Sequence, residues 1–223
     1  TEMSDIINRL EDHVASARMK TTPVIDFEKN ESLKGLDYLD TIYHAIVNEH
    51  PIQLKYRSFK ARSANNFIFY PYLLKEYRNR WFVYGVRGNG RILQNLALDR
   101  IQSLEVLPQE HYIKNTFFDP NTFFDDLVGV TKNSGSVAEK IGFKVAAAEA
   151  PYIITKPIHR SQQVVERLAD GSVILEIEVV INHELERVFF GYAEGIQVLY
   201  PKTLVELMGR KLKKAAEQYT HSK

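Results

Sequence analysis

The chain of 223 residues has no cysteine, a single tryptophan and three methionines. Because there is no thiol, a disulfide framework, a zinc knuckle and a thiol nucleophile are all excluded. No apolar run in the sequence approaches the roughly 18 residues that a membrane span needs. The N-terminus also lacks the basic-then-apolar order of a signal peptide. These absences predict a cytoplasmic protein with no membrane contact.

Motifs of catalysis and metal binding are missing as well. The sequence has no Gly-x-Ser-x-Gly, no Walker loop and no His-Glu-x-x-His. Its seven histidines show no i, i+4 pair that could hold a metal on one helix face. Asp119, Asp125 and Asp126 suit a cation, but a solvated acidic loop accounts for them more simply. We therefore predict no catalytic residue, no metal and no cofactor, with a small hydrolase assembled from distant residues as one alternative.

Charge is distributed unevenly along the chain, although the net charge is only +1. Between Ile52 and Val106 ten basic side chains stand against three acidic ones, a net charge of +7. The remainder of the chain then carries −6. A basic module beside an acidic one predicts an anionic ligand or nucleic acid for the first. The alternative is that these charges lie on the solvated outer face of a small sheet.

Helical patterns fill the first part of the chain. Thr1 opens it inside an amphipathic pattern that includes Ile6, Leu10 and Val14, so we expect a fragment whose upstream segment is missing. A second pattern over residues 36–47 places its apolar positions on one helix face, and Pro51 stops it. Residues 1–48 are thus predicted to be an N-terminal helical and linker segment.

The hydrophobic period changes to two at Ile52, which indicates strands. Five short strands are predicted at 52–56, 67–70 (ending at Pro71), 81–84, 92–98 and 101–107, with a turn at Gly88-Asn89-Gly90. So many strands in about 55 residues are typical of a small barrel or a strongly bent sheet. We assign this barrel to residues 49–110 and a linker with an aromatic loop at 117–124 to residues 111–137.

Residues 138–223 alternate between strand and helix patterns. Predicted strands at 140–147, 164–168, 173–181 and 196–199 enclose helices at 148–154 and after Asn182, and Pro201 opens a last helix. Asp170-Gly171 is a hairpin signal, Asn182 a helix cap, and Gly195 a helix stop. The order β-α-β-β-α-β is the ferredoxin-like arrangement, so the fold class is α+β.

Several segments together carry a resemblance to a known family. In the first half they are Tyr70-Pro71-Tyr72-Leu73-Leu74, Arg80-Trp81-Phe82-Val83 and Leu98-Asp99-Arg100-Ile101. This set resembles the WYL domain of bacterial transcription regulators. The segments at 157–162, 182–185 and 196–201 are similar to the extension that often follows WYL domains. The resemblance covers roughly residues 36–220.

The resemblance implies a Sm-like five-stranded β-barrel followed by a ferredoxin-like module, usually downstream of a winged helix-turn-helix, which this chain does not show. It implies the ligand-sensing and dimerising part of a DNA-binding regulator, whose effector is a nucleotide or single-stranded nucleic acid. DNA would be bound through the missing N-terminal domain. The open N-terminal helix and the 117–124 loop also favour a homodimer. A Sm-type nucleic-acid-binding barrel with no sensing role is the other alternative.

This sequence departs from the family pattern at several positions. The name-giving triplet reads Trp81-Phe82-Val83. Phe67 and Phe69 stand before Pro71 where many members carry an arginine. Gln94 and Ala97 stand before the closing motif, where many members have another arginine. These changes bear on whether the family's usual ligand pocket is retained.

A phosphate site needs a fixed bidentate donor, and a nucleotide site adds an aromatic surface for the base. The predicted ligand-binding residues, in decreasing order of support, are Arg80, Arg100, Tyr56 and Trp81, then Arg57 and Lys75, then His159, Ser161 and Gln162. Structural roles stay open for several of them. We favour a core position for Trp81, Arg100 could pair with Asp99, and Tyr56 could be a buried structural tyrosine. The three residues of the second module could form a plain polar strand edge.

Overall fold

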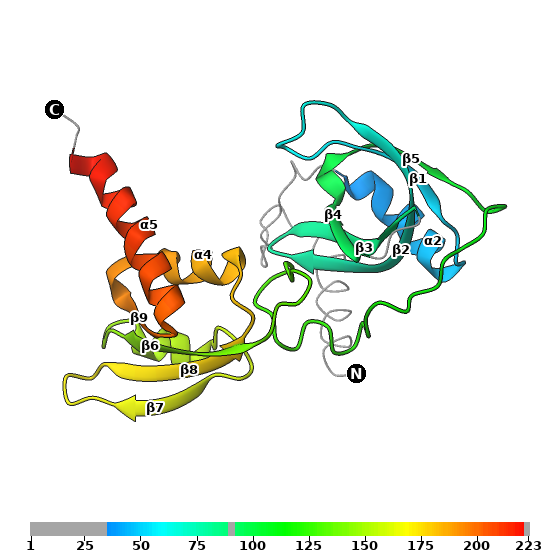
Figure 1. Cartoon of the computed structure of the whole chain (residues 1–223). Helices are drawn as coiled ribbons and strands as arrows, with labels where there is room; N and C mark the ends of the chain where they lie inside the picture. The colour runs from blue at the N-terminus through cyan, green and yellow to red at the C-terminus, as the bar shows by residue number, and fades with distance from the viewer. Residues whose placement is uncertain (1–34, 89–91, 221–223) are drawn as a thin grey trace, which may run out of the picture. The chain divides into compact units, whose positions relative to one another are not determined.

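A computed structural model describes residues 35–88 and 92–220. The amphipathic pattern at residues 6–17 and the Asn89-Gly90 part of the predicted turn lie outside these ranges. The described chain forms two antiparallel sheets with helices, so the α+β class is confirmed (Figure 1). Within the described residues, no helix is both long and apolar enough to cross a membrane.

The first sheet has five strands in the order β4-β3-β2-β1-β5. Their bounds are β1 Ile52–Tyr56, β2 Asn65–Tyr77, β3 Arg80–Arg87, β4 Gln94–Ala97 and β5 Ile101–Val106. The short helix η3 (Leu98–Arg100) joins the two edge strands, β4 and β5. Among the described residues β4 and β5 form no ladder with each other. The sheet is therefore not closed, and the expected Sm-like barrel is not confirmed.

The helical pattern at 36–47 forms η2 (Leu36–Tyr38) and α2 (Leu39–Val47), as predicted. Ile42 and Ala45 on α2 are buried together with apolar residues of the first sheet. The other buried residues of this core cluster are Ile52, Leu54, Tyr56, Phe69, Val83, Leu96 and Ile101 of the sheet and Leu98 of η3. The alternating burial of Ile52, Leu54 and Tyr56 confirms the half-buried strand that the sequence predicts.

Strand β2 is longer than expected. The prediction that it ends at Pro71 is wrong, because the strand continues to Tyr77. The β2–β3 register shifts between Pro71 and Leu73, and such a bulge tolerates a proline that lacks an N–H group. The hairpin that follows turns at Arg78 and Asn79, whose φ angles of 51° and 60° suit a tight two-residue turn.

The 117–124 loop is covered within the chain. The Tyr84 ring lies 5.8 Å from Phe123 and 5.3 Å from Phe124, measured between centroids. The Tyr72 hydroxyl donates to the Ile113 carbonyl at 2.9 Å. Because these rings pack against the first sheet and are only partly exposed, the loop is a weaker reason to expect a partner subunit.

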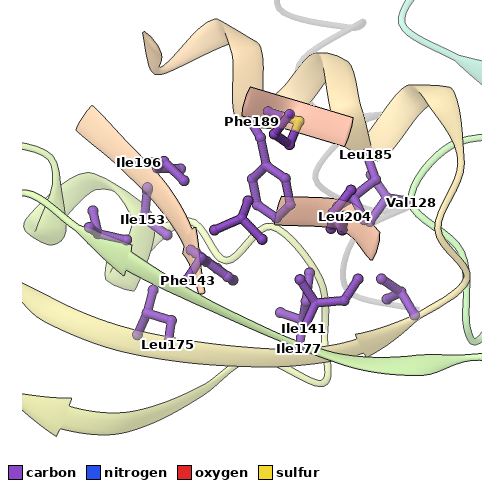
Figure 2. Packing of buried hydrophobic residues seen from close by; sticks show 14 of the residues in the cluster. Val128, Ile141, Phe143, Ile153, Leu175, Ile177, Leu185, Phe189, Ile196 and Leu204 are labelled. Atoms are coloured by element: carbon purple, nitrogen blue, oxygen red, sulfur yellow. The ribbon is translucent and has the colours of Figure 1, made fainter. Parts of the chain in front are cut away.

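The second sheet has the order β7-β8-β6-β9. Its elements are β6 (Glu139–Val145), α3 (Ala150–Thr155), β7 (Gln163–Arg167), β8 (Val173–Val179), α4 (His183–Gly191), η4 (Ala193–Gly195), β9 (Ile196–Tyr200) and α5 (Lys202–Thr220). This is the predicted succession of strands and helices. Figure 2 shows how Phe143, Ile177, Leu185, Phe189 and Leu204 meet in the core between the sheet and its helices.

The predicted helix signals have mixed outcomes. The Asn182 side chain accepts a hydrogen bond from the Leu185 N–H group at 2.9 Å and so caps α4, as expected. Gly195 does not end α4, which stops at Gly191, and instead closes the short helix η4. The intervening turn is held by Tyr192, whose carbonyl accepts from Gly195 N–H at 2.7 Å.

Candidate ligand-binding site

Two segments far apart in the sequence meet at one end of the first sheet. Strand β1 pairs with β5, and the register shifts between Lys55 and Tyr56, so that Tyr56 lies opposite Ile101. The next residue, Arg57, donates its backbone N–H to the Arg100 carbonyl at 3.1 Å. This hydrogen bond joins the loop that follows β1 to the short helix η3, which precedes β5.

A pocket of about 310 Å³ lies at this junction. Its lining residues are Arg57, Ser58, Phe59, Asp99, Arg100, Ile101 and Gln102. The volume is at the lower end of the range for small-ligand sites, which begins near 300 Å³. Two of the lining side chains are arginines, so the pocket has the chemistry to receive an anion.

Asp99 lies between two guanidinium groups. Arg80 Nε is 3.5 Å from one of its carboxylate oxygens, and Arg100 Nε is 4.0 Å from the other. The second separation is too long for a hydrogen bond. Arg100 Nε and Asp99 Oδ1 are both buried, and neither has a hydrogen-bond partner among the described residues. Since buried unpaired polar atoms are costly, this pair is poorly satisfied within the fold, while the exposed 26% of the Arg100 side chain faces solvent where it lines the pocket.

The sequence does not predict Phe59, Ser58, Ile101 or Gln102 as lining residues, and Phe59 is the aromatic one among them. Its side chain is 73% exposed, although it is a large apolar group. The Arg100 guanidinium carbon lies 4.4 Å from the centre of its ring, which is cation–π distance. The sequence signal that could have identified Phe59 is an aromatic residue within the polar run Arg57-Ser58-Phe59-Lys60, directly after a predicted strand.

Tyr56 does not line the pocket. It is 8% exposed and belongs to the core cluster of the first sheet. Burial raises the pKa of the Tyr56 phenol, and the positive charge of Arg100 opposes that rise. Tyr56 is thus a close neighbour of Arg100 that helps to set its surroundings.

The remaining candidates of the first sheet lie elsewhere. Trp81 is half-buried and packs against the core cluster, the position we favour from the sequence. The Lys75 ammonium lies 4.7 Å from the centre of the Phe124 ring, so it contacts the aromatic loop. Arg80 does not line the pocket but reaches Asp99, which does.

His159, Ser161 and Gln162 hold a turn of the second module. His159 Nδ1 is 2.7 Å from Ser161 Oγ, which accepts from Glu178 N–H at 2.9 Å. The Gln162 amide donates to the Ile153 carbonyl at 3.0 Å. Burial lowers the pKa of His159, which favours its neutral form. These contacts supply a structural reason for all three residues.

Asp125 and Asp126 of the linker are engaged in ion pairs, and Asp119 Oδ1 accepts hydrogen bonds from the backbone and side chain of Asn121. Asp125 pairs with Arg160 at 2.7 Å, and Asp126 pairs with Lys132 at 2.8 Å. Across residues 35–88 and 92–220, no group of three His, Cys, Asp or Glu side chains could hold a metal ion.

Two family models match the chain. The first, described as WYL domain, matches residues 37–106, and the second, described as WCX domain, matches residues 138–216. The chain thus contains a WYL domain followed by a WCX domain. The WYL domain contains the first sheet, α2 and the whole pocket lining, from Arg57 to Gln102. The WCX domain contains the second sheet and the turn of His159.

Two solved structures have a distant likeness to this chain. One is proteasome accessory factor B/C (PafBC) of Arthrobacter aurescens, with 16% identity, a TM-score of 0.39 and coverage of 87% of this chain. Another is a CRISPR Cas-related protein, with 13% identity, a TM-score of 0.47 and coverage of 81%. The WYL chain spans 30% and 50% of their lengths, respectively. No curated protein matches the chain.

Proposed function

We propose that this chain is the effector-sensing part of a transcription regulator, and that its effector carries a phosphate group bound between Arg57 and Arg100. The observation that carries the proposal is the Arg100 side chain, which lines the pocket with 26% of its surface exposed and whose contact with Asp99 is too long for a hydrogen bond. A guanidinium without a short carboxylate partner can form strong charge-assisted hydrogen bonds with a phosphate oxygen.

The charge of the WYL domain supports the same ligand class. The stretch from Ile52 to Val106 carries a net charge of +7, which attracts anions before they reach the pocket. Arg57 is exposed beside the pocket, and Arg80 adds a third guanidinium through Asp99. A nucleotide or a single-stranded nucleic acid fits this arrangement, since both present phosphate oxygens.

We propose a sensing role and not a catalytic one for this pocket. Among the described lining residues the one hydroxyl is that of Ser58, and no histidine lies beside it as a general base. The regulator would contact DNA through a segment outside this chain.

We further propose that the regulator is a homodimer. Support comes from α5, whose outer turns extend from the second sheet (Figure 1). Leu212 and Tyr219 are 40% and 86% exposed, and they continue the helix face on which Leu204 and Met208 are buried. Sedimentation at micromolar concentrations should give twice the mass of 25.8 kDa, and a monomer would refute the dimer.

The phosphate site is tested by titrating the full chain with short oligonucleotides and with nucleotides at low salt. Replacing Arg100 by Ala should weaken binding by about 1–3 kcal/mol, because a charge-assisted hydrogen bond is lost. Arg62→Ala is the matched control, since Arg62 is exposed in the same loop but does not line the pocket. Affinity for single strands should fall with salt at a log–log slope of about −0.7 per phosphate contacted.

Absence of saturable binding at low salt would refute the proposal. Equal affinities of the Arg100 and Arg62 variants would refute it too, because the pocket arginine would then not be the contact. A melting curve of each variant separates lost binding from lost folding, and Arg100→Lys offers a milder change that keeps the charge.

A further inference from the structure

Phe59 is an exposed aromatic residue at the wall of the pocket, in contact with Arg100. Scattered exposed apolar side chains are normal and need no explanation. Phe59 differs because it lines the pocket and contacts the arginine that carries the phosphate proposal. It lies in the loop between β1 and β2, three residues beyond the end of β1 at Tyr56. The loop therefore presents an aromatic surface at the wall of an anion site.

Arg100 occupies one face of this aromatic ring. The guanidinium carbon is 4.4 Å from the ring centre, so the cation packs against the π surface. With 73% of Phe59 exposed, the opposite face is the one that remains accessible. A planar group that stacks there completes a three-layer sandwich of planar group, phenyl ring and guanidinium.

We propose that Phe59 stacks the base of a nucleotide unit whose phosphate is held by Arg57 and Arg100, so that the pocket selects a base-bearing phosphate over a plain anion. This inference rests on the proposed phosphate site. It assigns the stacking role to Phe59, because Tyr56 is buried and neither Tyr56 nor Trp81 lines the pocket.

The dimensions of the pocket limit the ligand to one such unit. A volume of about 310 Å³ is at the small end for ligand sites, and its wall is formed by one loop and one corner of the sheet. A free nucleotide and one unit of a single strand share the chemistry that this site recognises. Stacking a base on an aromatic side chain commonly contributes about fivefold to a hundredfold in affinity.

The test compares three probes on the full chain: inorganic pyrophosphate, adenosine monophosphate and a five-residue oligodeoxyadenylate. Phe59→Leu keeps an apolar side chain but removes the π surface. We expect it to weaken both base-bearing probes about five- to thirtyfold and to leave the pyrophosphate affinity within about twofold. Phe59→Trp should restore the base-bearing affinities. Tyr43→Leu is the matched control, since Tyr43 is an aromatic residue of α2 that is 55% exposed and does not line the pocket.

Fluorescence gives a second readout that does not depend on affinity. The chain has one native tryptophan, so Phe59→Trp adds one emitter to a simple background. A base that stacks on the new indole should quench its emission, whereas pyrophosphate should not. Quenching by the mononucleotide supports a free nucleotide ligand, and quenching by the oligonucleotide alone supports a strand.

The outcomes separate this inference from the phosphate site itself. If no probe binds, pyrophosphate included, the proposed function fails. If pyrophosphate binds and Phe59→Leu weakens all three probes equally, the ring only orders Arg100 and the stacking inference is overturned. It is also overturned if Phe59→Leu changes none of the affinities.

Discussion

Asp99 has a testable effect on the anion pocket, because it places a negative charge beside Arg100. Its carboxylate is 4.0 Å from Arg100 Nε, without a hydrogen bond, and 3.5 Å from Arg80 Nε. At that separation Asp99 opposes an incoming anion more than it orients the guanidinium. We therefore expect Asp99→Asn, which keeps the shape and removes the charge, to tighten the binding of an anion.

The size of the effect follows from Coulomb's law. Two unit charges 4 Å apart interact by about 1 kcal/mol in water and about 4 kcal/mol at an effective dielectric constant of 20. An anion on the far side of Arg100 is roughly twice as distant from Asp99, which halves these values to about 0.5 and 2 kcal/mol. Because the pocket is open to water, we expect about 1 kcal/mol, or about a fivefold gain in affinity.

Calorimetric titration with inorganic pyrophosphate at low salt measures this gain, since that probe has no base to stack. Glu105→Gln is the control, because Glu105 is an exposed acid on β5 that lies opposite Gln53 and outside the pocket. The control should change affinity by less than about twofold, as expected for a distant screened charge. Weaker binding by Asp99→Asn would refute the reasoning, because Asp99 would then hold Arg100 in place despite the long contact.

Two further predictions concern stability. Asn182→Ala should lower the free energy of unfolding by about 2–3 kcal/mol in urea denaturation, because α4 loses its cap and the Val128 and Thr131 carbonyls lose their donor. Asn121→Ala, at an exposed position, should have little effect and serves as the control. Burial raises the pKa of Tyr72 to about 12 from 10.0, so the fold favours the neutral phenol. The stability that this group contributes is present below pH 10 and is lost as the pH rises through 12. In melting experiments between pH 10 and 12, Tyr72→Phe should therefore lose less stability than the unsubstituted protein.

The second half of the chain was predicted closely because its signals are local. The turn Asp170-Gly171 separates two strand patterns, and Gly171 has a φ of 83° that a glycine adopts without strain. Asn182 precedes an apolar pattern of helical period and caps that helix. Such signals act within four residues, so neither distant contacts nor the order of strands in the sheet is needed to interpret them.

The errors in the first half arise where distant contacts decide the outcome. Pro71 is a local signal for a strand end, yet pairing with β3 across a bulge carries β2 on to Tyr77. Strand patterns in the sequence also do not tell which strands pair, and closure of the sheet depends on whether β4 pairs with β5. Local propensity for strands is a weak guide compared with these tertiary contacts.

The candidate site was predicted in part, for the same reason. Arg57 and Arg100 are 43 positions apart in the sequence, and only the β1–β5 ladder brings them to one pocket. Residue type alone ranked Trp81 and Tyr56 as stacking surfaces, although their neighbours in the sheet bury or cover them. The sequence does not predict Phe59 as a stacking residue, because only its exposure beside Arg100 distinguishes it from a core phenylalanine.

The Asp99–Arg100 pair contributes little to the stability of the fold, which agrees with the ligand-binding role that we propose for the pocket. A partly buried ion pair gains little over apolar side chains of similar volume, because desolvation offsets most of the attraction. Here the geometry is also poor, since the Asp99–Arg100 contact is 4.0 Å long and leaves Arg100 Nε and Asp99 Oδ1 unpaired. A fold selected for stability alone would gain by satisfying those atoms or by replacing them with apolar groups. Under our proposal an anion binds the exposed part of the Arg100 guanidinium, which has no short contact with Asp99 to give up.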